Sequence, residues 1–141
     1  VLELGSSPGG ASFYMLEKDC HVYGVDPAQM DQSCLQHTHF HHLQKSAQAV
    51  DILDLENIKI DWIVCDMNLN PKQSIDECLR LYNLCQKTPL GIIVNLKMVK
   101  DYHAERVHKY RLDFANAGFH HIINTQVLAH KREYALVAFK A

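Results

Sequence analysis

The chain has 141 residues, of which 48% are hydrophobic and 21% charged, with a formal net charge of −2, as expected for one ordinary globular domain. No apolar run reaches the roughly 18–20 residues of a membrane span, so we expect no membrane partner. The odd number of cysteines and the lack of a Cys-x-x-Cys pair argue against a disulfide scaffold or structural zinc, and favour a reducing cytoplasm: Cys20, Cys34, Cys65, Cys78 and Cys85.

Short β-type segments alternate with helical patterns along the chain, which is typical of a parallel sheet with crossover helices. The last two segments follow each other across a short polar link, so we expect the final strand to be antiparallel. The sequence therefore predicts an α/β fold with a mostly parallel seven-stranded sheet and helices on both faces. The expected strands are Val1–Leu4, His21–Val25, Thr38–Leu43, Trp62–Cys65, Leu90–Leu96, His120–Val127 and Tyr134–Phe139.

Two helices have clear signals. One follows Asn70-Pro71, where Ser74-x-x-Glu77 has the spacing of a capping box. Gly118 is well placed to end the other. Apolar residues at helical spacing predict their buried faces: Ile75, Cys78, Leu79, Tyr82 and Cys85 in the first, and Val107, Tyr110, Phe114 and Ala117 in the second.

The first expected strand is already under way at residue 1. A domain rarely begins inside a buried strand, because that edge needs covering. We therefore expect residues 1–141 to be one domain whose N-terminal part is missing.

A glycine-rich turn follows the first strand, and a carboxylate follows the second. The motif runs from the strand into the turn and then a helix, and its candidate cofactor-binding residues are Glu3, Gly5, Ser6, Ser7, Pro8, Gly9 and Gly10. Glycines let the backbone approach a ligand closely, and an acid at the place of Asp26 accepts hydrogen bonds from a ribose hydroxyl pair in a doubly wound fold. The Gly-x-Gly-x-x-Gly spacing of nicotinamide and flavin sites is absent.

Charge is unevenly spread along the chain. Up to Leu96, six Lys and Arg residues face twelve acids, whereas from Lys97 onward eight basic residues face four acids. A basic C-terminal third can bind the phosphate backbone of a nucleic acid, and Lys131 and Arg132 are candidate phosphate contacts. Ordinary solvated helix faces give the same charge pattern.

Glu-x-Gly-x-x-Pro-Gly-Gly followed by an acid resembles the FtsJ-like (RrmJ) methyltransferases, a family with a Rossmann-like methyltransferase fold. Three further stretches match in order: Asp61-Trp62-Ile63-Val64-Cys65-Asp66-Met67, Asn95-Leu96-Lys97 and His130-Lys131-Arg132-Glu133. Within the family, the nearest resemblance is to the RlmM type, which methylates a cytidine ribose of 23S ribosomal RNA.

The resemblance implies S-adenosyl-L-methionine as cofactor and RNA as partner. Carried over residue by residue, the family's Lys-Asp-Lys-Glu tetrad supplies Asp66, Lys97 and Glu133, and its first lysine lies upstream of the glycine motif. Asp66 also lies near the cofactor in this assignment. Where the family often has an acid for the adenine amino group, this chain reads Lys45-Ser46-Ala47, so Ser46 or a nearby carbonyl would serve.

The expected topology brings these residues together without reference to the family. Asp66 closes the fourth strand, Lys97 closes the fifth, and Glu133 opens an antiparallel last strand. All three then lie on the carboxyl rim, the sheet edge formed by the carboxyl ends of the parallel strands, where ligands bind. A ribose hydroxyl needs a base, and lysine can be that base when its pKa is lowered by desolvation or a neighbouring cation. We expect Lys97 to be the base.

The function that the sequence favours is S-adenosylmethionine-dependent RNA 2′-O-ribose methyl transfer. Two alternatives stay open: a same-fold methyltransferase with a non-RNA acceptor, and a non-catalytic cofactor- or RNA-binding module. His37, His39 and His41 alternate along one segment, but we interpret them as a polar strand face near a sheet edge, and we expect no metal. The sequence does not predict the oligomeric state.

Overall fold

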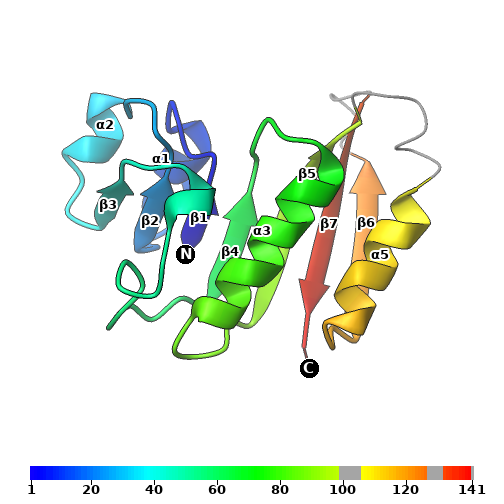
Figure 1. Cartoon of the computed structure of the whole chain (residues 1–141). Helices are drawn as coiled ribbons and strands as arrows, with labels where there is room; N and C mark the ends of the chain where they lie inside the picture. Colours follow the sequence, from blue (N-terminus) through cyan, green and yellow to red (C-terminus); the bar gives the residue numbers. More distant parts are fainter. Residues whose placement is uncertain (99–105, 127–131, 141) are drawn as a thin grey trace.

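The computed structural model describes residues 1–98, 106–126 and 132–140, and its seven strands form one sheet in the order β3-β2-β1-β4-β5-β7-β6 (Figure 1). Val127, His130 and Lys131, which the sequence analysis placed in a strand and a motif, lie outside these residues. The strands are β1 (Leu2–Leu4), β2 (Val22–Val25), β3 (Phe40–Leu43), β4 (Trp62–Cys65), β5 (Gly91–Lys97), β6 (His121–Gln126) and β7 (Glu133–Phe139).

The strand directions confirm the predicted topology. Strands β1 to β5 pair in parallel, and β7 runs antiparallel between β5 and β6. In β7, Glu133 pairs with Lys97 at the end of β5. The antiparallel strand therefore starts on the carboxyl rim, at the top of Figure 1.

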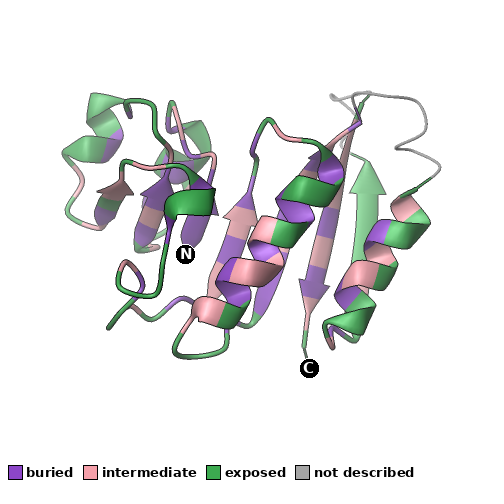
Figure 2. Cartoon of the chain, in the orientation of Figure 1, coloured by how far each residue is buried: buried purple, intermediate pink, exposed green. Residues whose placement is uncertain are grey.

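Helices cover both faces of the sheet, as predicted. On one face lie α3 (Pro71–Leu84) and α5 (Val107–Asn116). On the other lie α1 (Gly10–Leu16) and α2 (Gln32–Leu35), which pack with β2 and β3 around a smaller apolar cluster. A short 3-10 turn, η1 (Ala47–Ala49), follows β3. Figure 2 shows the buried positions concentrated in the sheet and on the inner sides of α3 and α5. No described helix is long and apolar enough to cross a membrane.

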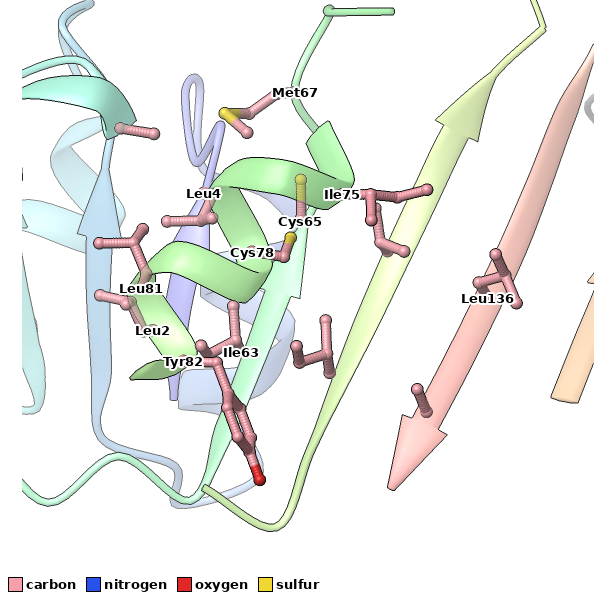
Figure 3. Close-up of a cluster of buried hydrophobic side chains, with 14 of the residues drawn as sticks. Leu2, Leu4, Ile63, Cys65, Met67, Ile75, Cys78, Leu81, Tyr82 and Leu136 are labelled. Atoms are coloured by element: carbon pink, nitrogen blue, oxygen red, sulfur yellow. The ribbon is translucent and has the colours of Figure 1, made fainter. Parts of the chain in front are cut away.

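The larger core lies between the sheet and α3 (Figure 3). Of the residues predicted to form the buried face of this helix, Ile75, Cys78 and Tyr82 are buried, whereas Leu79 and Cys85 are only partly buried. Leu81, which was not predicted for this face, is fully buried. Cys65 of β4 faces the same core.

The capping-box prediction for α3 is wrong. Asn70 caps the helix, with its Oδ1 accepting a hydrogen bond from Gln73 N at 3.1 Å. Pro71 takes the first helical position, where its missing N–H is not needed. Ser74 is already inside the helix, 1% exposed, and Glu77 pairs with Arg80 instead. At the other predicted helix end, Gly118 has φ +84°, as expected for a residue that stops a helix.

Candidate functional site

The glycine turn between β1 and α1 is shaped by two residues with left-handed backbone. Gly5 has φ +79°, and a Cβ there would lie 2.9 Å from the carbonyl oxygen of Asp66. Gly9 has φ +124°, and a Cβ there would lie 2.7 Å from Cys34 Sγ. Both positions therefore require glycine. Around Gly10, by contrast, a Cβ would meet no heavy atom within 4 Å.

Asp26 connects this turn to the end of β2. Its Oδ2 accepts a hydrogen bond from Ser7 N at 3.2 Å, and its Oδ1 accepts one from Ala28 N at 2.8 Å. A carboxylate has about four acceptor positions, so two remain for a ligand. The hydroxyls of Ser6 and Ser7 support the turn by donating to Met30 Sδ and to the Gln29 carbonyl.

A cavity of 270 Å³ opens beside the turn on the carboxyl rim. It includes three of the predicted cofactor residues, Gly5, Asp26 and Ser46. The other predicted cofactor residues, Glu3, Ser6, Ser7, Pro8, Gly9, Gly10 and Asp66, do not line it. Sequence reasoning missed its remaining walls, which follow the ends of β2, β3 and β4: Val25, Pro27, Ala47, Gln48, Met67, Asn68 and Leu69.

Arg80 of α3 fixes the wall of this cavity that contains η1. Its guanidinium donates to the carbonyls of Ala47 at 2.7 Å and Val50 at 2.9 Å, and its Nε pairs with Glu77. The turn that carries Ser46 is therefore anchored to a long helix through a charged donor.

Glu3 lies beneath the glycine turn and is 2% exposed. The Ser12 hydroxyl of α1 donates a hydrogen bond to its Oε2. Burial raises the pKa of Glu3 to about 7, the Ser12 hydrogen bond opposes that rise, and the charges of Asp66 and Asp26 add to it. Because this pKa is about 7, Glu3 is protonated below neutral pH and about half protonated at neutral pH.

The three predicted catalytic residues meet at the carboxyl rim. Lys97 Nζ lies 2.6 Å from Asp66 Oδ1 and 3.1 Å from Glu133 Oε1. The side chains of Lys97 and Glu133 are each 21% exposed, whereas that of Asp66 is 51% exposed. The arrangement is a lysine held between two carboxylates, open to solvent on the Asp66 side.

The electrostatics of Lys97 differ from the expectation of a lowered pKa. Desolvation alone lowers the pKa of Lys97, but hydrogen bonds to Asp66 and Glu133 and their negative charges outweigh it, so the pKa is raised. Among the described residues, the two carboxylates have the dominant effect on the pKa of Lys97, so its amine is protonated at neutral pH.

Asn95 belongs to the same cluster and was not assigned a role from the sequence. Its Nδ2 donates to Asp66 Oδ1 at 3.1 Å and to Glu133 Oε2 at 2.8 Å. The available signal is its spacing, because residues two apart in a strand share a face and Lys97 lies two residues on.

Two further cavities differ in their relation to this cluster. One of 270 Å³ is lined by Lys97, Met98, Arg132 and Glu133, so it adjoins the cluster directly. Another of 550 Å³ lies at the opposite edge of the sheet and contains no predicted site residue; its lining includes Trp62, His21 and Tyr23. The candidate active site is the carboxyl rim, where the predicted residues converge, although the cavity of 550 Å³ lies elsewhere.

Of the three alternating histidines, only His41 lies in the edge strand, because His37 and His39 precede β3. His41 belongs to the edge strand β3 and stacks on Tyr23, while His39 stacks on His21 with ring centroids 4.0 Å apart. Over residues 1–98, 106–126 and 132–140, no group of three or more His, Cys, Asp or Glu side chains is arranged to hold a metal.

Comparison with known proteins places these features in context. A family model described as FtsJ-like methyltransferase matches residues 1–123. Two proteins named ribosomal RNA large subunit methyltransferase M are similar: that of Chromohalobacter salexigens is 24% identical over 96% of this chain, and that of Laribacter hongkongensis is 26% identical over 97%. The chain spans only 37% and 38% of their lengths.

The fold has close structural counterparts. The fibrillarin pre-rRNA processing protein of Methanococcus jannaschii superposes with a TM-score of 0.75 at 18% identity, covering 98% of this chain and 64% of that one. At this identity the likeness concerns the fold alone. It agrees with the Rossmann-like methyltransferase fold expected from the sequence.

Proposed function

Since the chain belongs to the FtsJ-like methyltransferase family, we propose that it transfers a methyl group from S-adenosylmethionine to a ribose 2′-hydroxyl of RNA, with 23S ribosomal RNA as the expected substrate. The observation that carries the proposal is the convergence of Asp66, Lys97 and Glu133 within hydrogen-bonding distance on the carboxyl rim. The names of the ribosomal RNA methyltransferases that it resembles support the substrate class.

We propose the cavity beside the glycine turn as the cofactor site. Gly5 keeps the backbone close to the end of β4, and Asp26 has acceptor positions left for a ribose hydroxyl pair. Ser46 and Gln48 offer polar groups on the η1 side, where the adenine would lie. When bound, S-adenosylmethionine supplies a methyl group activated by its positively charged sulfur.

The proposed role of the cluster around Lys97 is to accept the proton of the acceptor hydroxyl. We assign Lys97 as the base, with Asp66 and Glu133 orienting its amine. Its neutral form must be available, and the raised pKa makes that form scarce at neutral pH. A cation beside Asp66 would compete for the carboxylate and lower the pKa of Lys97; the tetrad lysine that the family has upstream is such a group.

The acceptor nucleotide has a candidate place next to the cluster. The cavity lined by Lys97, Met98, Arg132 and Glu133 puts two proposed catalytic side chains in one wall. The exposed guanidinium of Arg132 is a phosphate-binding group of the kind expected from the basic C-terminal third.

We propose the cytoplasm as the location of the protein. Ribosomal RNA as the proposed substrate favours it, and so do the free cysteines throughout the described part of the chain.

The test is product analysis. The full-length protein would be incubated with labelled S-adenosylmethionine and ribosomal RNA that lacks the modification, and the digested RNA examined for 2′-O-methylnucleosides. We expect methyl on ribose. If the methyl group is found on a base, a protein or a small molecule instead, the proposed ribose acceptor is wrong. Cofactor binding without transfer to any acceptor would favour a non-catalytic module.

A further inference from the structure

Four polar side chains form a closed ring at the carboxyl rim. Lys97 bridges Asp66 and Glu133 with its ammonium group, and Asn95 bridges the same two carboxylates with its amide. Asp66 Oδ1 receives both donors, and Glu133 receives one on each oxygen. Within this ring, each carboxylate therefore receives one charged donor and one neutral donor.

The amide of Asn95 can face the carboxylates in one orientation only, with Nδ2 toward them. Its Oδ1 is then buried, and no described residue donates a hydrogen bond to it. An unpaired buried acceptor destabilises a fold. Side chains alternate between the two faces of a strand, and Asn95 shares its face of β5 with Ile93 and Lys97, both partly buried. Since no described residue satisfies its Oδ1, the interactions that favour asparagine here are those of its Nδ2 with the two carboxylates.

Asn95 is better placed than Lys97 to fix the carboxylates. Its short side chain stands on β5 between β4, which Asp66 follows, and β7, which Glu133 opens. Lys97 has a long flexible side chain, and Asp66 is half exposed on the loop after β4. Without the amide, Asp66 is held, among the described residues, only by the ion pair with the long Lys97 side chain, and it can turn toward water more easily.

We propose that Asn95 is a positioning residue that holds Asp66 and Glu133 around Lys97 for the methyl transfer. The inference rests on the proposed function for its kinetic consequence. Its structural content, that the carboxylates lose their places around Lys97 when the amide is removed, does not depend on which acceptor is methylated.

The kinetic test uses Asn95→Ala and the isosteric Asn95→Asp in the full-length protein. Both remove the two N–H donors, and the second keeps the side-chain volume. We expect each to lower kcat on the order of tenfold to hundredfold, because a misplacement of about 1 Å can cost on the order of 10²-fold in rate, while the Kd for S-adenosylmethionine stays near the wild-type value. Asn83→Ala and Asn83→Asp, at an exposed position of α3, are the matched controls.

A second readout is independent of activity. The pKa of Lys97 can be followed by nuclear magnetic resonance with isotope-labelled lysine. In Asn95→Ala, release of Asp66 leaves Lys97 with a weaker carboxylate partner, so the pKa of Lys97 should fall from its raised value. Glu133 and the exposed Arg132 are the other charged groups beside it, and neither is changed.

The outcomes separate the two claims. A wild-type protein that methylates no RNA overturns the proposed function, and the Lys97 titration then decides the role of Asn95. Wild-type transfer combined with an unchanged kcat in both Asn95 variants overturns the positioning role. An unchanged Lys97 titration in Asn95→Ala overturns it as well.

Discussion

The proposed cofactor side and the proposed catalytic side of the carboxyl rim are built in different ways. On the cofactor side, backbone geometry places the groups: Gly5 and Gly9 have left-handed φ values, and backbone N–H groups hold Asp26. On the catalytic side, side-chain charges do so, through Lys97, Asp66 and their neighbours. The first region should therefore be sensitive to added volume, and the second to lost charge or lost donors.

The largest expected effect on the cofactor side is that of Gly5→Ala. A left-handed backbone costs a non-glycine residue about 1–2 kcal/mol, and displacing packed atoms costs about 1–3 kcal/mol more. We expect a loss of about 4 kcal/mol in the free energy of unfolding, measured by urea denaturation, and weaker cofactor binding by calorimetry. Gly10→Ala should leave stability nearly unchanged, because its new Cβ meets nothing within 4 Å. Equal losses in the two variants would contradict the assignment of the turn geometry to Gly5.

Glu3→Gln tests the buried carboxyl beneath the turn. Because the pKa of Glu3 is raised from 4.5 to about 7, its contribution to stability is complete below pH 4.5 and is lost as pH rises through about 7. The glutamine variant should therefore match the wild type near pH 4.5 and exceed it at pH 8 by up to about 3 kcal/mol.

The measurement for Glu3 is the free energy of unfolding across this pH range. Glu56→Gln, at an exposed position, should leave the pH profile unchanged. A Glu3→Gln variant with the wild-type pH dependence would show that Glu3 does not titrate in this range.

Arg80→Ala should have the smallest effect. Loss of the donors to the Ala47 and Val50 carbonyls frees the η1 wall of the proposed cofactor cavity. Since the side chain is partly exposed, we expect about fivefold weaker binding of S-adenosylmethionine by calorimetry, equivalent to about 1 kcal/mol. Arg111→Ala, which removes a contact to Asn124 far along the sheet, is the control. An unchanged affinity in Arg80→Ala would show that η1 needs no anchor.

The same division explains how far the sequence predicts this molecule. Strand order and rim positions follow from apolar runs and their ends, so the meeting of Asp66, Lys97 and Glu133 was foreseeable. The contacts of Asn95 depend on the register of β4, β5 and β7, which no short-range pattern specifies.

Local competition explains the remaining differences. At α3, two cap signals lay four residues apart, and Asn70 followed by Pro71 prevailed over Ser74. The anchoring of η1 by Arg80 links residues thirty or more positions apart through helix packing. The raised pKa of Lys97 likewise follows from carboxylate distances that the sequence does not contain.

The most direct test of the account is Lys97→Met, which keeps the length of the side chain and removes its amine. Methyl transfer to unmodified ribosomal RNA and the Kd for S-adenosylmethionine would be measured on the same full-length preparation. The account predicts that transfer falls by roughly 10²–10⁴-fold, the usual contribution of a general base, with cofactor affinity within about threefold of the wild type. Transfer at the wild-type rate would contradict the assignment of Lys97 as the base.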